Sequence, residues 1–194
     1  GVYAYSSAID MTGGTIGGEE SDANEAPYGG GVYLDGSSEG GYSTFTMSGG
    51  AVCGNKSTGK GGGVYVYDGC TFTMSDSAEV RGNKISGSES SNTSNGHGGG
   101  VYVVNGTFTM DGGAVRGNSA VKNGGGVYVN ASSSGSAAFT MNDGASVCGN
   151  STPQDGGGVY VYKVGNGNVT FTMKGGAEVR GNSAVNGGGV YMYN

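Results

Sequence analysis

Apolar and polar residues alternate along the chain in short runs of four residues. Val64-Tyr65-Val66-Tyr67 follows three glycines, then comes Thr71-Phe72-Thr73-Met74, then Ala78-Glu79-Val80-Arg81. A period of two places alternate side chains on opposite faces of a strand. We therefore predict three short strands that turn Val, Phe, Met and Ala inward, and Tyr, Thr, Glu and Arg outward.

This three-block unit recurs from one end of the chain to the other. The third glycine of each triplet stands at positions 1, 31, 63, 100, 126, 158 and 189, which gives spacings of 30, 32, 37, 26, 32 and 31. The link between the second and third blocks is always three residues, as in Ser48-Gly49-Gly50. Three strands with one fixed corner and two variable corners are typical of a β-solenoid coil. We predict an all-β fold, a parallel β-helix with three short strands per coil and about six coils, as a single array over residues 1–194.

Each third block ends in Gly-Asn, and these asparagines should form a stacked file. Asn tolerates left-handed backbone geometry beside Gly, so the file is expected at a tight turn. The glycine triplets are interpreted as corner residues. The asparagines are Asn55, Asn83, Asn118, Asn150 and Asn182.

Composition and charge narrow the function classes. The 46 glycines among 194 residues have no Gly-X-Y period, which excludes collagen and disfavours helices. Nine Lys and Arg against 15 Asp and Glu give 9 − 15 = −6, a charge that repels nucleic acid. No apolar window reaches the roughly 20 residues of a membrane span, so no membrane insertion is expected. Cys53, Cys70 and Cys148 form no disulfide framework, and we expect free thiols or links between neighbouring rods.

Tyrosines in the first block are the main candidate binding surface. If their rings face outward, they can stack on sugar rings or pack on another rod. Alternatively, stacked tyrosines only stabilise the sheet, or the inserts cover them. The file consists of Tyr33, Tyr65, Tyr102, Tyr128, Tyr160 and Tyr191, with Tyr3 before it, and a partial second file holds Tyr5, Tyr67, Tyr162 and Tyr193.

Threonines in the second block form an alternative surface. Their Thr-x-Thr array is similar to the ice-binding face of some β-solenoid antifreeze proteins, where regular hydroxyl and methyl groups order water. Two features count against ice binding: Ala138 and Asp10 interrupt the array, and inserts at its edge can disturb a flat face. The high strand propensity of Thr also explains why threonines recur at these positions. The face consists of Thr44, Thr46, Thr71, Thr73, Thr107, Thr109, Thr170 and Thr172.

The repeated Gly-Gly-Gly-Val-Tyr-Val, Phe-Thr-Met-x-Gly-Gly-Ala and Val-x-Gly-Asn-x-Ala runs resemble a known class of repeats. They are similar to the right-handed parallel β-helix repeats of adhesin-like bacterial surface proteins, in the style of polymorphic outer-membrane proteins and autotransporter passengers. The resemblance covers the whole chain. It implies right-handed coils, an extracellular or cell-surface location, and a structural and adhesive role without cofactors.

The expected role is a stiff stalk or filament that presents Tyr-rich and loop surfaces to glycans, host or cell-surface proteins, or partner rods. The chain starts and stops within a repeat and shows no export signal, anchor or cap, so we expect an excerpt of a longer array. Unpaired strand edges predict self-association, end to end or side by side.

The same superfold carries polysaccharide lyases and hydrolases, so an enzyme is the third hypothesis. Such sites need clustered carboxylates, for Ca²⁺ or for acid and base roles, beside basic side chains. Glu79 with Arg81 and Glu178 with Arg180 are interpreted as surface ion pairs, and His97 has no evident partner. We expect no catalytic residue, metal or cofactor. The acidic run is interpreted as a solvated loop, with a Ca²⁺ site as the alternative; it holds Glu19, Glu20, Asp22 and Glu25.

Overall fold

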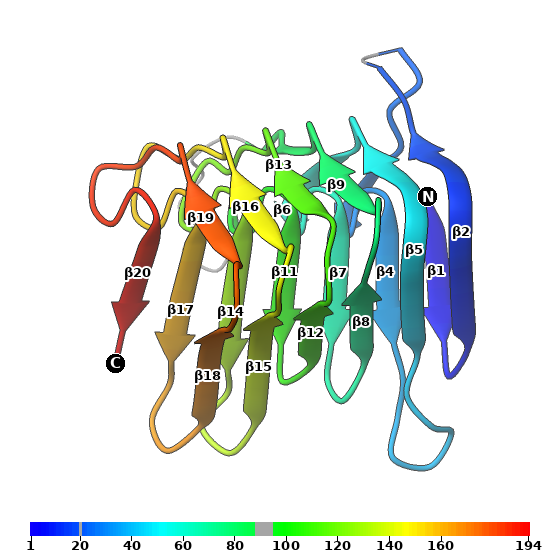
Figure 1. Cartoon of the computed structure of the whole chain (residues 1–194). Coiled ribbons are helices and arrows are strands. Elements are labelled where there is room, and N and C mark those ends of the chain that lie inside the picture. Colours follow the sequence, from blue (N-terminus) through cyan, green and yellow to red (C-terminus); the bar gives the residue numbers. More distant parts are fainter. Residues whose placement is uncertain (20, 88–94) are drawn as a thin grey trace.

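The chain folds as a stack of parallel β-strand coils, which confirms the predicted all-β solenoid. The computed structural model describes residues 1–19, 21–87 and 95–194, and this part contains strands and no helix. The coils form a solenoid of about six turns with three strands per turn. Figure 1 shows the chain winding from the blue N-terminal coil at one end to the red C-terminal strand at the other.

The first block of every repeat contributes one strand to a parallel sheet. Within the described residues this sheet has seven strands in chain order along the axis. Its in-register partners are equivalent residues of successive repeats, for example Tyr65 with Tyr102 and Tyr102 with Tyr128. The strands are β1 (Val2–Tyr5), β4 (Val32–Asp35), β7 (Val64–Tyr67), β11 (Val101–Val104), β14 (Val127–Ala131), β17 (Val159–Lys163) and β20 (Val190–Tyr193).

The second and third blocks form the remaining two faces. In the first two turns they merge into single long strands, β2 (Ala8–Gly17) and β5 (Thr44–Cys53). In later turns the three-residue link separates them, as predicted. The second-block strands are β8 (Thr71–Met74), β12 (Thr107–Met110), β15 (Ser136–Met141) and β18 (Asn168–Met173). The third-block strands are β9 (Glu79–Arg81), β13 (Ala114–Arg116), β16 (Ser146–Cys148) and β19 (Glu178–Arg180).

A small three-stranded sheet, separate from the seven-stranded and ten-stranded sheets, lies at the corner after the Gly-Asn pair, where the sequence predicts only an insert. It joins β3 (Glu25–Tyr28), β6 (Lys56–Lys60) and β10 (Lys84–Ile85). Farther along the axis the same corner keeps single bridges, such as Ser119 with Ser151. Because parallel coils bring their connecting segments side by side, even a five-residue link can form ladder bonds with its neighbours.

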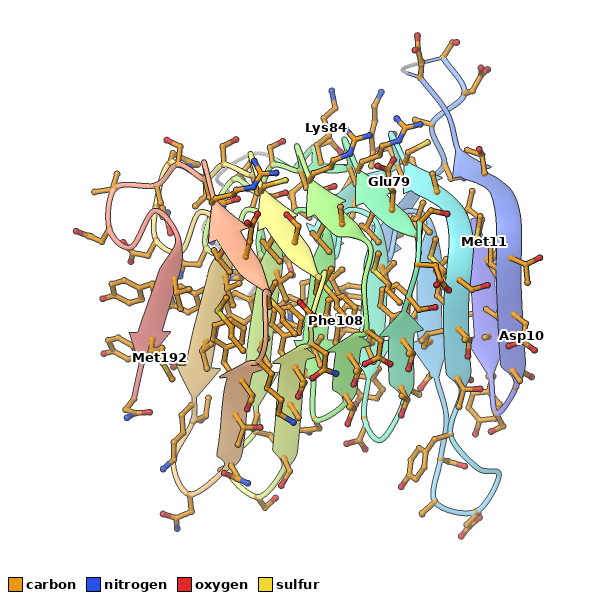
Figure 2. All side chains as sticks on the ribbon, in the orientation of Figure 1. Asp10, Met11, Glu79, Lys84, Phe108 and Met192 are labelled. Atoms are coloured by element: carbon orange, nitrogen blue, oxygen red, sulfur yellow. The ribbon has the colours of Figure 1, made fainter. Side chains whose placement is uncertain are left out.

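The core lies between the three faces and matches the predicted alternation. Val64, Phe72, Met74 and Val80 are fully buried, and their equivalents in neighbouring turns join one continuous cluster. Figure 2 shows Phe108 between the sheets, among the side chains that fill the interior. The Phe rings stack at 4.8 to 5.2 Å between centroids, in the order Phe45, Phe72, Phe108, Phe139 and Phe171.

The predicted asparagine file is confirmed as a buried amide ladder. Asn83 Nδ2 donates to Asn118 Oδ1 at 3.0 Å, and Asn118 Nδ2 donates to Asn150 Oδ1 at 3.0 Å. Each Nδ2 also donates to a backbone carbonyl, as Asn118 does to Val80 at 3.0 Å. The proposed left-handed asparagine is wrong: the preceding glycine, such as Gly117 with φ of 62°, takes that geometry. Asn is therefore required for its amide group rather than for its backbone freedom.

The middle glycine of the triplet is required by the close approach of neighbouring coils. A Cβ built on Gly125 would lie 2.5 Å from the carbonyl oxygens of both Gly157 and Ser151. We expect Gly125→Ala to force the coils apart and to lower the free energy of unfolding by about 1 to 3 kcal/mol, measured by chemical denaturation. Gly13→Ala is the matched control, because nothing lies within 4 Å of that Cβ. Equal stability of the two variants would contradict this explanation of the triplet.

Candidate binding surfaces

The first-block tyrosines form a continuous stack on the side of the sheet opposite the core. Tyr65, Tyr102, Tyr128 and Tyr160 make a hydrophobic cluster separate from the interior cluster. Ring centroids of successive tyrosines lie 4.9 to 5.2 Å apart, and their planes differ by 5 to 11°. The stack continues to Tyr191 at 5.3 Å, and Tyr33 meets Tyr65 edge to face at 4.9 Å. The predicted file therefore exists, with its rings outside the core.

The expectation of exposed aromatic faces is wrong for the central tyrosines. The exposed fractions of Tyr65, Tyr102, Tyr128 and Tyr160 are 3 to 6%. Each ring covers the faces of its neighbours, and two side chains from the preceding corner also pack on the stack. Lys60 Nζ lies 5.2 Å from the centroid of the Tyr102 ring, and His97 lies 4.7 Å from the Tyr128 ring. The stack therefore stabilises the sheet, which is the alternative that the sequence leaves open.

Burial shifts the ionisation of these phenols. It raises the pKa of Tyr102 to about 12, an effect that a hydrogen bond with Asn130 partly opposes. The pKa of Tyr160 also rises to about 12, through burial and the nearby Asp155 carboxylate. Burial raises the pKa of Tyr65 and Tyr128 as well. The fold therefore favours the neutral phenol.

Alkaline pH should destabilise the protein for this reason. The unfolded chain releases phenol protons near pH 10, whereas the folded chain holds them to about pH 12. We expect the free energy of unfolding to be unaffected by these groups below about pH 10 and to fall as the pH rises from about 10 to 12. Urea denaturation across this range measures the effect. Tyr128→Phe removes one buried phenol and should make the fall shallower; an unchanged slope would contradict the prediction.

A groove runs beside the tyrosine stack, parallel to the solenoid axis. Its volume is about 490 Å³. Edges of Tyr102, Tyr128 and Tyr160 form its floor. The groove has two walls. One wall consists of residues that stand directly before a glycine triplet, and the other consists of residues that stand two positions after a stacked tyrosine in the same strand. The walls are Lys60, His97 and Asn123 on one side, and Asn130, Tyr162 and Tyr193 on the other.

The threonine face keeps a regular register through the middle of the solenoid. Thr73 pairs in register with Thr46 on one side and with Thr109 on the other. The register of the Thr-Phe-Thr-Met strands is unbroken from β5 to β18, so the inserts do not disturb it. Thr140, which was not among the predicted residues, continues the second column between Thr109 and Thr172. At one end Asp10 occupies this column and points away from the solenoid in Figure 2.

The third face carries the predicted ion pairs and one additional contact. Glu79 accepts from Arg81 Nε at 3.0 Å and Glu178 accepts from Arg180 Nε at 2.8 Å. Arg116 of the next coil also binds Glu79 through two bonds of 2.9 Å each. The Arg116 guanidinium holds the pKa of Glu79 below its usual range. The Arg116–Glu79 pair joins β13 to β9, whereas the other two pairs each lie within one strand, β9 or β19. Figure 2 labels Glu79 on this face.

The other titratable candidates are also placed by the structure. His97 has partners, contrary to expectation: its ring packs on Tyr128, and its Nδ1 accepts from the Asn123 backbone N–H at 3.3 Å. In the acidic run, Glu19, Asp22 and Glu25 are exposed, and Glu20 lies outside the described residues. Within the described part of the chain, His, Cys, Asp and Glu form no group of three or more that can hold a metal ion.

The three cysteines are free thiols in the structure. Cys53 and Cys70 are buried, and Cys148 is half-buried. Cys53 pairs in register with Arg81, and Cys148 pairs with Arg116 and Arg180. Only Cys148 is therefore positioned to reach a neighbouring molecule.

Comparisons with known proteins leave the chain without an assigned relative. No family model matches it, and no curated protein and no solved structure matches it either. Among the described residues, no helix is long and apolar enough to cross a membrane. The repeat geometry and the surfaces described above therefore carry the functional argument.

Proposed function

We propose that this chain is a non-catalytic scaffold segment of a secreted or cell-surface bacterial protein. It forms a stiff stalk that presents its side surfaces to glycans or partner rods. The observation that supports the proposal is the continuity of three side-chain ladders, Asn, Phe and Tyr, through successive coils. Such ladders tie each coil to the next, so bending or opening one coil must break contacts in all three. The surface location rests on the resemblance of the repeats to adhesin-like proteins.

A coil deletion tests the scaffold role. Deleting residues 127–158 removes one repeat of 32 residues and joins equivalent positions, Gly126 and Val159. We expect a folded chain with unchanged strand content by circular dichroism, a rod shorter by about 4.8 Å in small-angle scattering, and a lower denaturation midpoint. Deleting residues 127–142 removes half a repeat and is the control, because it destroys the register. If the whole-coil deletion also fails to fold, the repeats do not act as interchangeable scaffold units.

Ice or surface-water binding is the second candidate, and the threonine face favours it. Two columns of hydroxyl and methyl groups remain in register from β5 to β18, interrupted only by Ala138 in the first column. Thermal hysteresis of the purified chain is the measurement. We expect it to disappear in the Thr73→Leu and Thr109→Leu double variant and to persist in Thr58→Leu, an exposed threonine on β6. No hysteresis in the unmodified chain would remove this candidate.

A further inference from the structure

The groove beside the tyrosine stack has the form of a site for an extended chain. Its lining begins at Lys60, before β7, and reaches Tyr193 on β20. These positions span five coils, or about 19 Å at the spacing of neighbouring strands. Because each coil contributes equivalent positions, the groove offers a repeating set of contacts along its length. A linear polymer with a repeating unit fits this arrangement better than a compact ligand.

The lining combines aromatic rings with polar groups that suit hydroxyl-rich ligands. Tyr162 and Tyr193 stand on one wall with ring centroids 5.7 Å apart, and both are more exposed than the buried stack. Tyrosines present an apolar ring for contact and a hydroxyl for hydrogen bonding. The carboxamides of Asn123 and Asn130 add donors and acceptors. Lys60 and His97 are the groove's basic groups. The Asp155 carboxylate holds the equivalent wall position in the repeat after Asn123 and lies near Tyr160.

One polar atom in the groove lacks its hydrogen bond. Asn130 Oδ1 is buried and has no partner among the described residues. The side chain of Asn130 also bonds to Tyr102. If the amide is turned over, the unpaired group becomes the Nδ2 donor instead, so one half of this carboxamide is unsatisfied in either orientation. A buried amide group without a partner costs free energy. The Oδ1 atom is closed to solvent, so a ligand hydroxyl supplies the missing bond when the half-buried Asn130 side chain turns toward the groove.

From these observations we propose that the groove binds a neutral, linear, hydroxyl-rich polysaccharide. Sugar rings stack against Tyr162 and Tyr193, and a sugar hydroxyl bonds to Asn130. This assignment rests on the proposed scaffold function and names a ligand class for one of its surfaces. It also shifts the site within the predicted tyrosine surface: the buried stack from Tyr65 to Tyr160 supplies the floor, and Tyr162 and Tyr193 of the second file contact the ligand from a wall.

Isothermal titration calorimetry of the full chain tests the proposal, with cellohexaose, xylohexaose and mannohexaose as neutral probes and hexagalacturonate as a charged probe. We expect at least one neutral hexasaccharide to bind. Tyr162→Ala and Asn130→Leu should each weaken that binding about tenfold. Tyr67→Ala is the matched control, because Tyr67 shares the register column of Asn130 and Tyr162 but lies outside the groove.

The results of these experiments distinguish failure of the groove proposal from failure of the scaffold proposal. Circular dichroism first shows that each variant is folded. If the folded chain binds no neutral hexasaccharide, or binds hexagalacturonate alone, the groove proposal is overturned while the coil-deletion result stands. Binding that survives both wall substitutions, or that falls equally in Tyr67→Ala, places the ligand elsewhere and also overturns it. Failure of the coil deletion to fold would instead overturn the scaffold function.

Discussion

Asn118→Ala is expected to lower the free energy of unfolding by about 3 to 5 kcal/mol. The substitution removes the acceptor of the Asn83 backbone N–H and Nδ2, at 2.9 and 3.0 Å, and the donor to the Val80 carbonyl. Asn83 and Asn118 are at most 1% exposed, so water does not replace these bonds. Urea denaturation measures the loss, and hydrogen exchange should show the Asn83 amide losing protection first.

The matched control for this variant is Asn186→Ala. The Asn186 Nδ2 donates to Asp155 Oδ1 at 2.8 Å, and that bond is exposed. Water can satisfy both groups after the substitution, so we expect a change below about 1 kcal/mol. Equal destabilisation by the two variants would show that the buried ladder contributes nothing beyond an ordinary side-chain hydrogen bond.

Phe108→Ala is expected to destabilise the solenoid to a similar extent, about 3 to 5 kcal/mol. Phe108 is fully buried and stacks on Phe72 and Phe139 at 4.8 Å on either side. Its removal leaves a cavity that ladder bonds on both sides prevent from collapsing. Thermal unfolding followed by circular dichroism measures the effect. Thr109→Ala, the next residue and on the outer face, should leave the midpoint nearly unchanged, and a comparable drop there would contradict the assignment of inner and outer faces.

The repeat alone predicts most of this fold because identical blocks must occupy equivalent places in every coil. The alternation in Val64 to Tyr67 gives the inner and outer faces, and the Gly-Asn positions give the ladder. Alternation does not say what covers an outward side chain. The burial of Tyr102 and Tyr128 depends on Lys60 and His97, which precede the triplets and vary in type between repeats.

The binding surface is harder to predict than the fold for the same reason. The walls of the groove come from two positions that lie several residues apart in each repeat, such as Asn123 and Asn130. The residue before each triplet has no constant type, so a search for recurring motifs passes over that wall. The other wall is found in part, because Tyr162 and Tyr193 belong to the partial second tyrosine file. The repeat register could identify these wall residues, because equivalent positions stack along the axis. The residue before each glycine triplet therefore flanks the column of stacked tyrosines. The small sheet of β3, β6 and β10 does not follow from the repeat, because its strands form only where neighbouring links lie side by side.

The asparagine ladder also gives the solenoid a direction. Each side-chain amide donates toward the next higher repeat, from Asn55 to Asn83, Asn118, Asn150 and Asn182. Aligned amide bonds polarise one another, so every added coil strengthens the bonds already present. The two poles of the stack therefore differ chemically, one offering acceptors and the other donors. A contact that continued this array would have to keep its direction, so it would be heterologous rather than a symmetric pair of identical faces.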